Sequence, residues 1–122
     1  MRALRWLLAC TSVVLVMSVT AACGSSKKST ASSGGGTTIA AQDYQFSPNS
    51  LSTKAGASVT FTFKNEGKTE HNFSVTEANV STDAENGDTK KVTFTAPSSP
   101  GSYQFFCKYH KARGMTGTLT VT

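Results

Sequence analysis

From residue 37 onward, apolar and polar residues alternate with a period of two in several short runs. This alternation is typical of half-buried β-strands, because successive side chains of a strand point to opposite faces of a sheet. The clearest run covers residues 58–64, and further strands are predicted at residues 42–46, 71–75, 91–95, 103–105 and 117–122. No stretch carries the period of an amphipathic helix.

Turn-forming residues separate these runs, as in Ser47-Pro48-Asn49 and Ser99-Pro100-Gly101. Short strands at close spacing predict an all-β fold, a Greek-key antiparallel β-sandwich. Residues 76–89 are polar with weak periodicity, so we expect a loop there.

The beginning of the chain has a different pattern. Residues 1–22 carry Arg2 and Arg5, then a short apolar stretch, then small residues, which is the pattern of an export signal peptide. The apolar stretch is shorter than the ~20 residues that a membrane-spanning helix needs. Residues 23–36 contain Gly, Ser, Thr, Ala and Lys but no large apolar side chain, which predicts a flexible linker. One globular domain is therefore expected at residues 37–122.

Cys23 directly follows the small residues Thr20, Ala21 and Ala22. This arrangement resembles the lipobox of bacterial lipoproteins, which implies cleavage before Cys23 and attachment of lipid to its thiol. The protein would then be held by a lipid anchor on the outer face of the cell membrane. A simple cleaved signal, giving a periplasmic protein, and an uncleaved anchor are the alternatives.

The formal charge of +5 owes much to the first part of the chain. Loss of Arg2 and Arg5 takes two charges from +5 and leaves +3, of which Lys27 and Lys28 lie in the linker. The domain is close to neutral, which argues against nucleic-acid binding. The acidic residues have no spacing typical of paired acid–base catalysis and are interpreted as ordinary surface: Asp43, Glu66, Glu70, Glu77, Asp83, Glu85 and Asp88.

Candidate chemistry begins with the cysteines. Of the three, Cys10 would leave with the signal and Cys23 would carry lipid, so Cys107 remains as a lone thiol. A lone thiol in an exported protein is a reactive group, a site of intermolecular pairing, or a ligand.

The third possibility is favoured by the residues around Cys107. Residues 107–115 have the spacing Cys-x2-His-x4-Met, with His110 and Met115, and the chain's other histidine is His71. Two imidazoles, a thiolate and a thioether are the ligands of a blue-copper site. A structural zinc site is disfavoured, since zinc usually takes several Cys or His ligands and no thioether.

The phase of the predicted strands gives an independent argument. Residues two apart in a strand share a face, and three of these ligands share a face with apolar residues: His71 with Phe73 and Val75, Cys107 with Tyr103 and Phe105, and Met115 with Leu119 and Val121. They would meet at one end of the core, while His110 would reach the same point from a loop.

Several stretches together resemble the cupredoxins, small blue-copper proteins of the plastocyanin and pseudoazurin type. The matching segments are Phe46-Ser47-Pro48, Ala55-Gly56, His71-Asn72-Phe73 and residues 103–107 and 114–117. The resemblance covers about residues 40–122 and implies one copper ion, Cu(I)/Cu(II), held by His71, Cys107, His110 and Met115. It also implies that Asn72 hydrogen-bonds across to the cysteine loop, with its amide directed at the sulfur.

These features predict a monomeric single-electron carrier at the outer face of a membrane. The alternatives are an extracytoplasmic protein for copper storage, delivery or resistance, and a metal-free adhesion-like sandwich. An enzyme is not expected, because four protein ligands leave no open position for a substrate. Lys108, Lys111 and Arg113 would surround His110, either as a solvated face or as a docking site for an acidic redox partner.

Overall fold

The computed structural model describes residues 31–32 and 36–122. These residues contain no α-helix, and no helix among them could span a membrane. They form one 3-10 helix, η1 (Lys111–Arg113), and the following strands: β1 (Ala31–Ser32), β2 (Thr38–Gln42), β3 (Gln45–Ser47), β4 (Ser50–Thr53), β5 (Ser58–Asn65), β6 (His71–Val75), β7 (Val80–Ala84), β8 (Thr89–Thr95), β9 (Gly101–Phe106) and β10 (Thr116–Val121). The predicted export signal, Cys10, Cys23 and most of the predicted linker lie outside the described residues.

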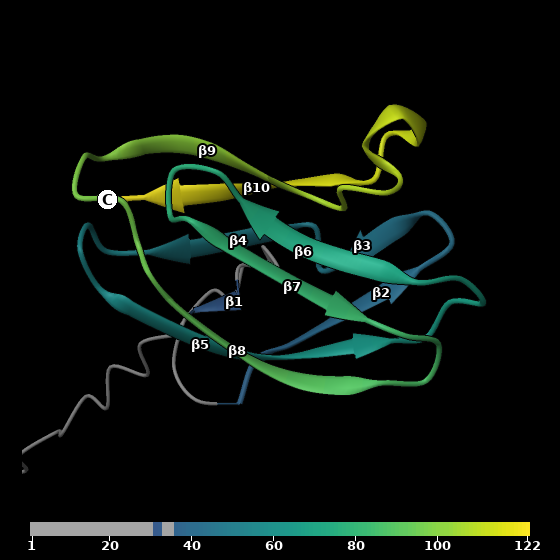
Figure 1. Cartoon of the computed structure of the whole chain (residues 1–122). Helices are drawn as coiled ribbons and strands as arrows, with labels where there is room; N and C mark the ends of the chain where they lie inside the picture. The colour runs from purple at the N-terminus through teal and green to yellow at the C-terminus, as the bar shows by residue number, and fades with distance from the viewer. Residues whose placement is uncertain (1–30, 33–35) are drawn as a thin grey trace, which may run out of the picture.

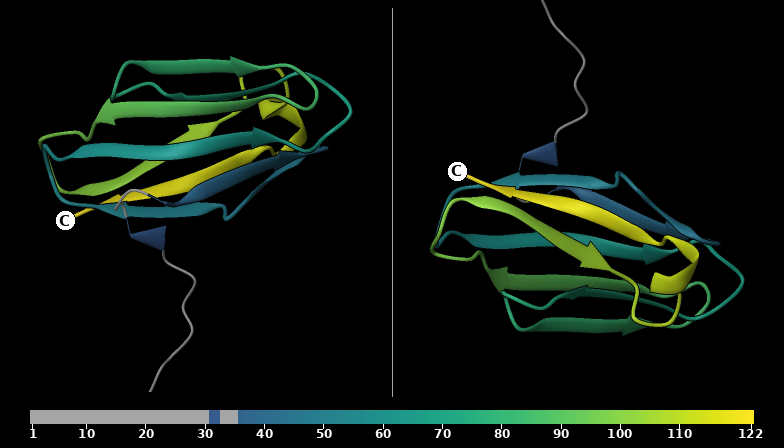
Figure 2. Two further views of the ribbon diagram at one scale, coloured as in Figure 1. Left: turned by 90° about the horizontal axis from the view of Figure 1, so that it is seen from below. Right: turned by 90° about the horizontal axis from the view of Figure 1, so that it is seen from above.

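The strands form two sheets that pack face to face (Figures 1 and 2). One has six strands in the order β1-β4-β10-β9-β6-β7, and the other has four in the order β3-β2-β5-β8. This arrangement confirms the predicted all-β sandwich. The inward-facing apolar residues of both sheets form a single buried core between them.

The sheets are mixed, whereas the sequence predicted an antiparallel sandwich. β2 pairs with β5 in parallel, and β4 pairs with β10 in parallel. The reason is that β4 belongs to the larger sheet although its neighbours in sequence, β3 and β5, belong to the smaller one. When the chain crosses from one sheet to the other, the next strand can run parallel or antiparallel to its neighbours. The alternation of apolar and polar residues is the same in both cases, so it does not predict the strand direction.

Two predicted segments differ in detail from the structure. Residues 42–46 are not one strand, because β2 ends at Gln42 and β3 begins at Gln45, with a turn at residues 43–44. Residues 76–89 were expected to be a loop but contain β7, an edge strand that pairs with β6. An edge strand with one solvated face can be largely polar, which explains its weak hydrophobic signal.

Phe73 of β6 lies at the centre of the core and is fully buried. Its ring centroid lies 4.7 Å from that of Phe61, 5.1 Å from Phe105 and 6.2 Å from Phe46. Aromatic pairs at such distances add about 0.5–1.5 kcal/mol each beyond the burial of their area. Every residue of β6 is buried, so this strand is fixed from both sides.

One end of the sandwich gathers segments that are far apart in the sequence. The β2–β3 turn, the beginning of β6 and the loop between β9 and β10, which carries η1, lie together at the end opposite the C-terminus (Figure 1). Four candidate ligands are carried by β6 and by this loop.

Candidate metal centre

The β9–β10 loop (residues 107–115) is closed by backbone hydrogen bonds at its base. The N–H of Cys107 donates to the carbonyl of Met115 at 3.1 Å, and the N–H of Met115 donates to the carbonyl of His110 at 3.3 Å. The N–H of His110 in turn donates to the carbonyl of Cys107 at 3.2 Å. Gly114 completes the turn with φ of 82°, a left-handed conformation that glycine adopts at little cost. The loop thereby folds Cys107, His110 and Met115 into one small region.

His71 reaches the same region from β6, of which it is the first residue. Its side chain is fully buried. Its Nδ1 lies 4.0 Å from the sulfur of Cys107, and the Nδ1 of His110 lies 3.5 Å from the same sulfur. One ligand atom from each of the three residues falls within 4.8 Å of the others.

These separations fit a single metal ion. Two ligands bound at about 2.0–2.3 Å to a shared ion lie roughly 3.5–4.0 Å apart when the angle between them is near 120°. Both imidazoles direct Nδ1 toward the thiol sulfur. Nitrogen and thiolate donors of this kind suit copper, which also accepts a weak axial thioether.

Met115 is the fourth predicted ligand. It lies directly before β10, its side chain is fully buried, and its backbone is paired with that of Cys107. The structure therefore places Met115 at the base of the loop, with its backbone next to that of Cys107. The result is a His-Cys-His-Met site of the type 1 copper kind.

His110 is the ligand nearest to solvent, being only partly buried. Burial lowers the pKa of its imidazole below the ordinary value, and the nearby His71 and Arg113 lower it further. The neutral form favoured in this way is the form that binds a metal. The ring of Tyr44 packs on it, with centroids 4.7 Å apart.

Asn72 ties β6 to the β9–β10 loop. Its backbone N–H donates to the sulfur of Cys107 at 3.3 Å. Its side-chain oxygen accepts from the N–H of Lys108 at 3.3 Å, and its side-chain amide donates to Asp83 at 2.8 Å. These bonds orient the cysteine loop, and a donor on the thiolate withdraws charge from the sulfur.

The three basic residues of the loop lie in different surroundings. Lys108 forms an ion pair with Asp83 at 2.7 Å, which raises the pKa of Lys108 and lowers that of Asp83. The Lys111 ammonium lies over the Phe106 ring at 4.2 Å, and the Arg113 guanidinium lies over the Tyr44 ring at 4.5 Å. All three belong to the loop that carries His110, but the charge of Lys108 is balanced by Asp83.

The interpretation of Asp43 as ordinary surface is wrong. Its carboxylate Oδ1 lies 2.9 Å from Nε2 of His71, the ring nitrogen that faces away from Cys107. The backbone N–H of Lys68 lowers the pKa of Asp43, and hydrogen bonds from His71 and Thr69 lower it further. No local motif marks this role, because Asp43 is 28 positions from His71 in the sequence.

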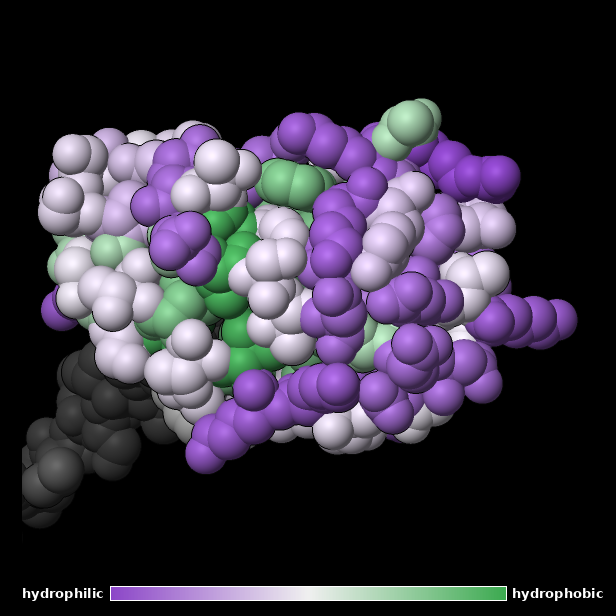
Figure 3. Space-filling model, in the orientation of Figure 1, coloured by the Kyte–Doolittle hydropathy of each residue, from purple (hydrophilic) through white to green (hydrophobic). Residues whose placement is uncertain are grey.

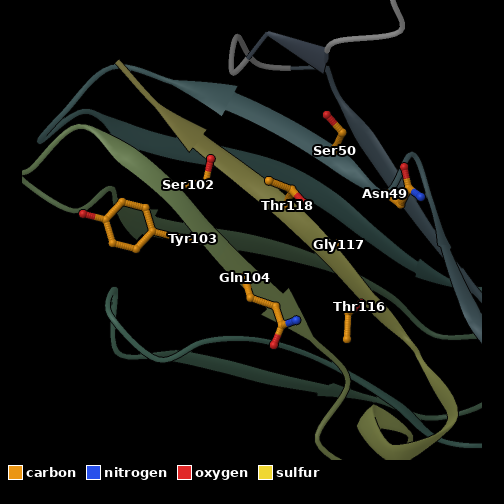
Figure 4. A pocket seen from close by; sticks show the side chains of 8 residues that line it. All are labelled: Asn49, Ser50, Ser102, Tyr103, Gln104, Thr116, Gly117 and Thr118. Carbon is orange, nitrogen blue, oxygen red and sulfur yellow. The ribbon is translucent and has the colours of Figure 1, made fainter.

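A separate shallow pocket lies on the outer side of β9 and β10 (Figure 4). Hydroxyl and amide side chains dominate its lining: Asn49, Ser50, Ser102, Tyr103, Gln104, Thr116, Gly117 and Thr118. None of these residues is a histidine, cysteine or carboxylate.

Comparisons with known proteins agree with this geometry. The model of the cupredoxin-like domain family matches residues 12–121. Chloroplastic plastocyanin of Hordeum vulgare is 36% identical over 88 residues, which cover 62% of this chain and 54% of that protein. Plastocyanin A/B of Petroselinum crispum is 35% identical over 88 residues, covering 62% of this chain and 86% of the relative. The chain thus spans about half the length of the Hordeum vulgare protein.

Solved structures give the same fold. Reduced auracyanin of Roseiflexus castenholzii has a TM-score of 0.58 and 26% identity, covering 73% of this chain and 99% of that one. Auracyanin A of Chloroflexus aurantiacus has a TM-score of 0.60 at 23% identity, covering 76% and 99%. With a two-sheet sandwich, a His-Cys-His-Met site at one end and a family match over nearly its whole length, this chain belongs to the cupredoxin-like domain family.

Proposed function

We propose that this protein binds one copper ion through His71, Cys107, His110 and Met115 and carries single electrons between redox partners. The observation that carries the proposal is the convergence of three donors within 4.8 Å at a site where His71 and Cys107 are fully buried. Plastocyanin relatives at 35–36% identity support the same class of function.

Copper supplies, when bound, a one-electron couple between Cu(I) and Cu(II). The protein holds the donors in place before binding, since His71 is part of β6 and Cys107 is tied to Met115 and Asn72. Donors fixed in this way rearrange little between oxidation states, which favours fast transfer. The surrounding core, including the fully buried Phe105 and Leu119, excludes water and helps to set the potential.

His110 is the natural route for electrons to leave and enter. Among the four ligands, His71, Cys107 and Met115 are fully buried, whereas His110 is only partly buried. A partner that contacts this end of the molecule would approach the site most closely through its imidazole.

Voltammetry of the copper-loaded protein tests the proposal. A carrier gives a reversible one-electron wave, and its copper exchanges slowly with a competing chelator. Cys107→Ser serves as the control, because it replaces the thiolate ligand with a hydroxyl and keeps a small side chain at this buried position. Rapid loss of copper without a reversible wave would instead support storage, delivery or resistance as the function.

The partner is proposed to present an acidic surface, and the carrier to act as a monomer. On the face seen in Figure 3, hydrophilic side chains gather over the half of the molecule that carries the β9–β10 loop. Within the described residues the one large exposed hydrophobic side chain is Tyr109. Lys111 and Arg113 would supply most of the attraction, since Lys108 is paired with Asp83. An exchange rate that does not fall with ionic strength would overturn this docking proposal.

The location is proposed to be the outer face of a cell membrane. The sequence supports it through the signal-like residues 1–22 and the lipobox-like Cys23. Mass spectrometry of the mature protein tests it: a lipid-modified N-terminal Cys23 is the expected result. An unmodified N-terminus would support the periplasmic alternative.

A further inference from the structure

One polar contact links the metal centre to the opposite sheet. Asp43 lies in the turn between β2 and β3 of the smaller sheet, whereas His71 begins β6 of the larger one. The Asp43 carboxylate meets Nε2 of His71 at 2.9 Å, with the imidazole fully buried and the carboxylate side chain 26% exposed. His71, which belongs to the larger sheet, is therefore held in place by a residue of the smaller sheet.

The orientation of the Asp43 carboxylate is itself fixed. The backbone N–H of Lys68 donates to both of its oxygens, at 3.0 and 3.2 Å, and the hydroxyl of Thr69 donates to Oδ1 at 3.1 Å. Residues 68 and 69 lie in the segment that leads into β6, so the same segment positions His71 and its carboxylate partner. Hydrogen bonds from these donors stabilise the negatively charged form of the carboxylate.

Gly67 provides a second observation about this contact. A methyl group at its Cα would collide with Oδ1 of Asp43 and with Nε2 of His71. Gly67 is not among the residues with positive φ, so its backbone does not require glycine. The close approach to the Asp43–His71 pair explains the absence of a side chain at this position.

The chemistry of the contact determines the tautomer of His71. An ionised carboxylate only accepts hydrogen bonds, so the proton of the neutral imidazole must lie on Nε2. The lone pair then lies on Nδ1, the nitrogen 4.0 Å from the Cys107 sulfur. A carboxylate in this position also fixes the ring orientation of a metal-binding imidazole.

We propose that Asp43 is a positioning residue of the metal centre, which holds His71 in the Nε2-protonated tautomer and whose negative charge favours Cu(II) over Cu(I). The statement about copper rests on the proposed function, whereas the statement about the tautomer concerns the metal-free protein. Within the part of the chain that the structure describes, His110 has no hydrogen-bonded carboxylate partner; its ring packs against Tyr44 and its Nδ1 faces the Cys107 sulfur. A carboxylate therefore fixes the tautomer of His71 but not that of His110.

Two substitutions separate hydrogen bonding from charge. Asp43→Asn can still accept from Nε2 through its side-chain oxygen but removes the negative charge, whereas Asp43→Ala removes both. Glu77→Gln is the matched control, because Glu77 is an exposed carboxylate in the turn that follows β6, at the other end of that strand from His71.

The first measurement uses the metal-free protein and nitrogen NMR of the imidazoles. We expect His71 to carry its proton on Nε2 in the wild type, in Asp43→Asn and in Glu77→Gln, and to populate both tautomers in Asp43→Ala. A wild-type His71 protonated on Nδ1, or an unchanged tautomer in Asp43→Ala, would overturn the positioning role.

The second measurement is the reduction potential of the copper-loaded variants. Loss of an outer carboxylate partner typically weakens metal binding 10- to 100-fold. If the loss falls mainly on Cu(II), each tenfold change raises the potential by about 59 mV. We expect an increase in Asp43→Asn and Asp43→Ala and none in Glu77→Gln. Equal potentials in Asp43→Asn and the wild type would overturn the role of the charge.

The result that would refute the proposed function differs from the results that would refute the role of Asp43. A wild-type protein that binds no copper refutes the metal proposal, yet its His71 tautomer still tests the contact with Asp43. Gly67→Ala offers a further test of the contact, because its methyl group is placed between the two side chains. It should mix the tautomers of His71 as Asp43→Ala does, and an undisturbed Nε2 proton would count against a close-packed pair.

Discussion

The two histidines of the metal centre are held by regions of different character. His71 begins β6, where every residue is buried, and its outer nitrogen is bonded to Asp43 at 2.9 Å. His110 lies in the β9–β10 loop, is partly exposed, and packs against the ring of Tyr44. The first imidazole is fixed by the core and by both sheets, whereas the second is fixed by short-range hydrogen bonds within one loop.

This difference separates two requirements of an electron carrier. A donor set that barely moves needs a rigid, water-free base, and β6 supplies it through Phe73 and through the bond from Asn72 to the Cys107 sulfur. Contact with a partner needs an accessible edge, and the loop supplies it through His110. The sandwich thus provides rigidity on one side of the site and access on the other.

The largest expected effect comes from deleting each imidazole in turn. His110→Gly should lose the wild-type spectrum and regain it when free imidazole is added, because the vacated position opens toward solvent. His71→Gly should lose the spectrum without recovery, since its position is fully buried. Visible absorption with and without imidazole measures both. Equal recovery of the spectrum in His110→Gly and His71→Gly would contradict the difference in accessibility between the two histidines.

The β6 strand and the β9–β10 loop should also differ in how much they contribute to the free energy of unfolding. Phe73→Ala beside His71 in β6 removes a fully buried ring and should lower the free energy of unfolding by about 3–5 kcal/mol. Ala112→Gly in the exposed η1 should lower it by less than about 1 kcal/mol. Chemical denaturation of the metal-free variants provides the comparison. A loop variant as destabilising as the core variant would show that the loop also belongs to the folding core.

Met115→Leu sharpens the comparison at the base of the loop. Leucine fills a similar volume, so the fully buried position should be retained with a cost below about 1.5 kcal/mol. Copper should still bind through the remaining ligands, and the reduction potential should rise because a weak axial thioether is lost. Voltammetry measures the change, and an unchanged potential would exclude Met115 as the axial ligand.

The smallest effect is expected at the ion pair between Lys108 and Asp83. Both side chains are exposed, at 41% and 47%, so Asp83→Asn should cost only about 0.2–1 kcal/mol. Because the pKa of Asp83 is lowered in the folded state, its contribution is present above the ordinary value of 3.8 and lost as the pH falls through the lowered one.

The pKa of Lys108 is raised, so its part of the contribution is lost only as the pH rises above 10.5. Thermal unfolding against pH checks the signs. Wild type and Asp83→Asn should converge in stability as the medium becomes acidic, and a difference that grows with acidity would contradict the assignment.

Much of this arrangement could be predicted from the sequence, because it depends on local pattern. The spacing of Cys107, His110 and Met115 places them in one short loop, and strand alternation gives the buried face of His71 and Leu119. The all-β sandwich followed from the same alternation and is confirmed by the two sheets.

What could not be predicted depends on contacts between distant segments. Asp43 reaches Lys68 and His71 across 25 and 28 positions, and no spacing rule links a turn residue to a ligand in the other sheet. The parallel pairing of β4 with β10 and the polar edge strand β7 likewise follow from tertiary pairing rather than from hydrophobic period. The local sequence pattern predicts which face of a sheet a side chain lies on, but it does not predict which distant residue the side chain contacts.

Copper titration of the metal-free protein, followed by visible and electron paramagnetic resonance spectra, is the most direct test of the metal centre. We expect saturation at one ion per chain with an intense blue band, and loss of that band in Cys107→Ser, which lacks the thiolate. No blue band in the wild type, or the same band in Cys107→Ser, would contradict a copper centre built on the Cys107 sulfur.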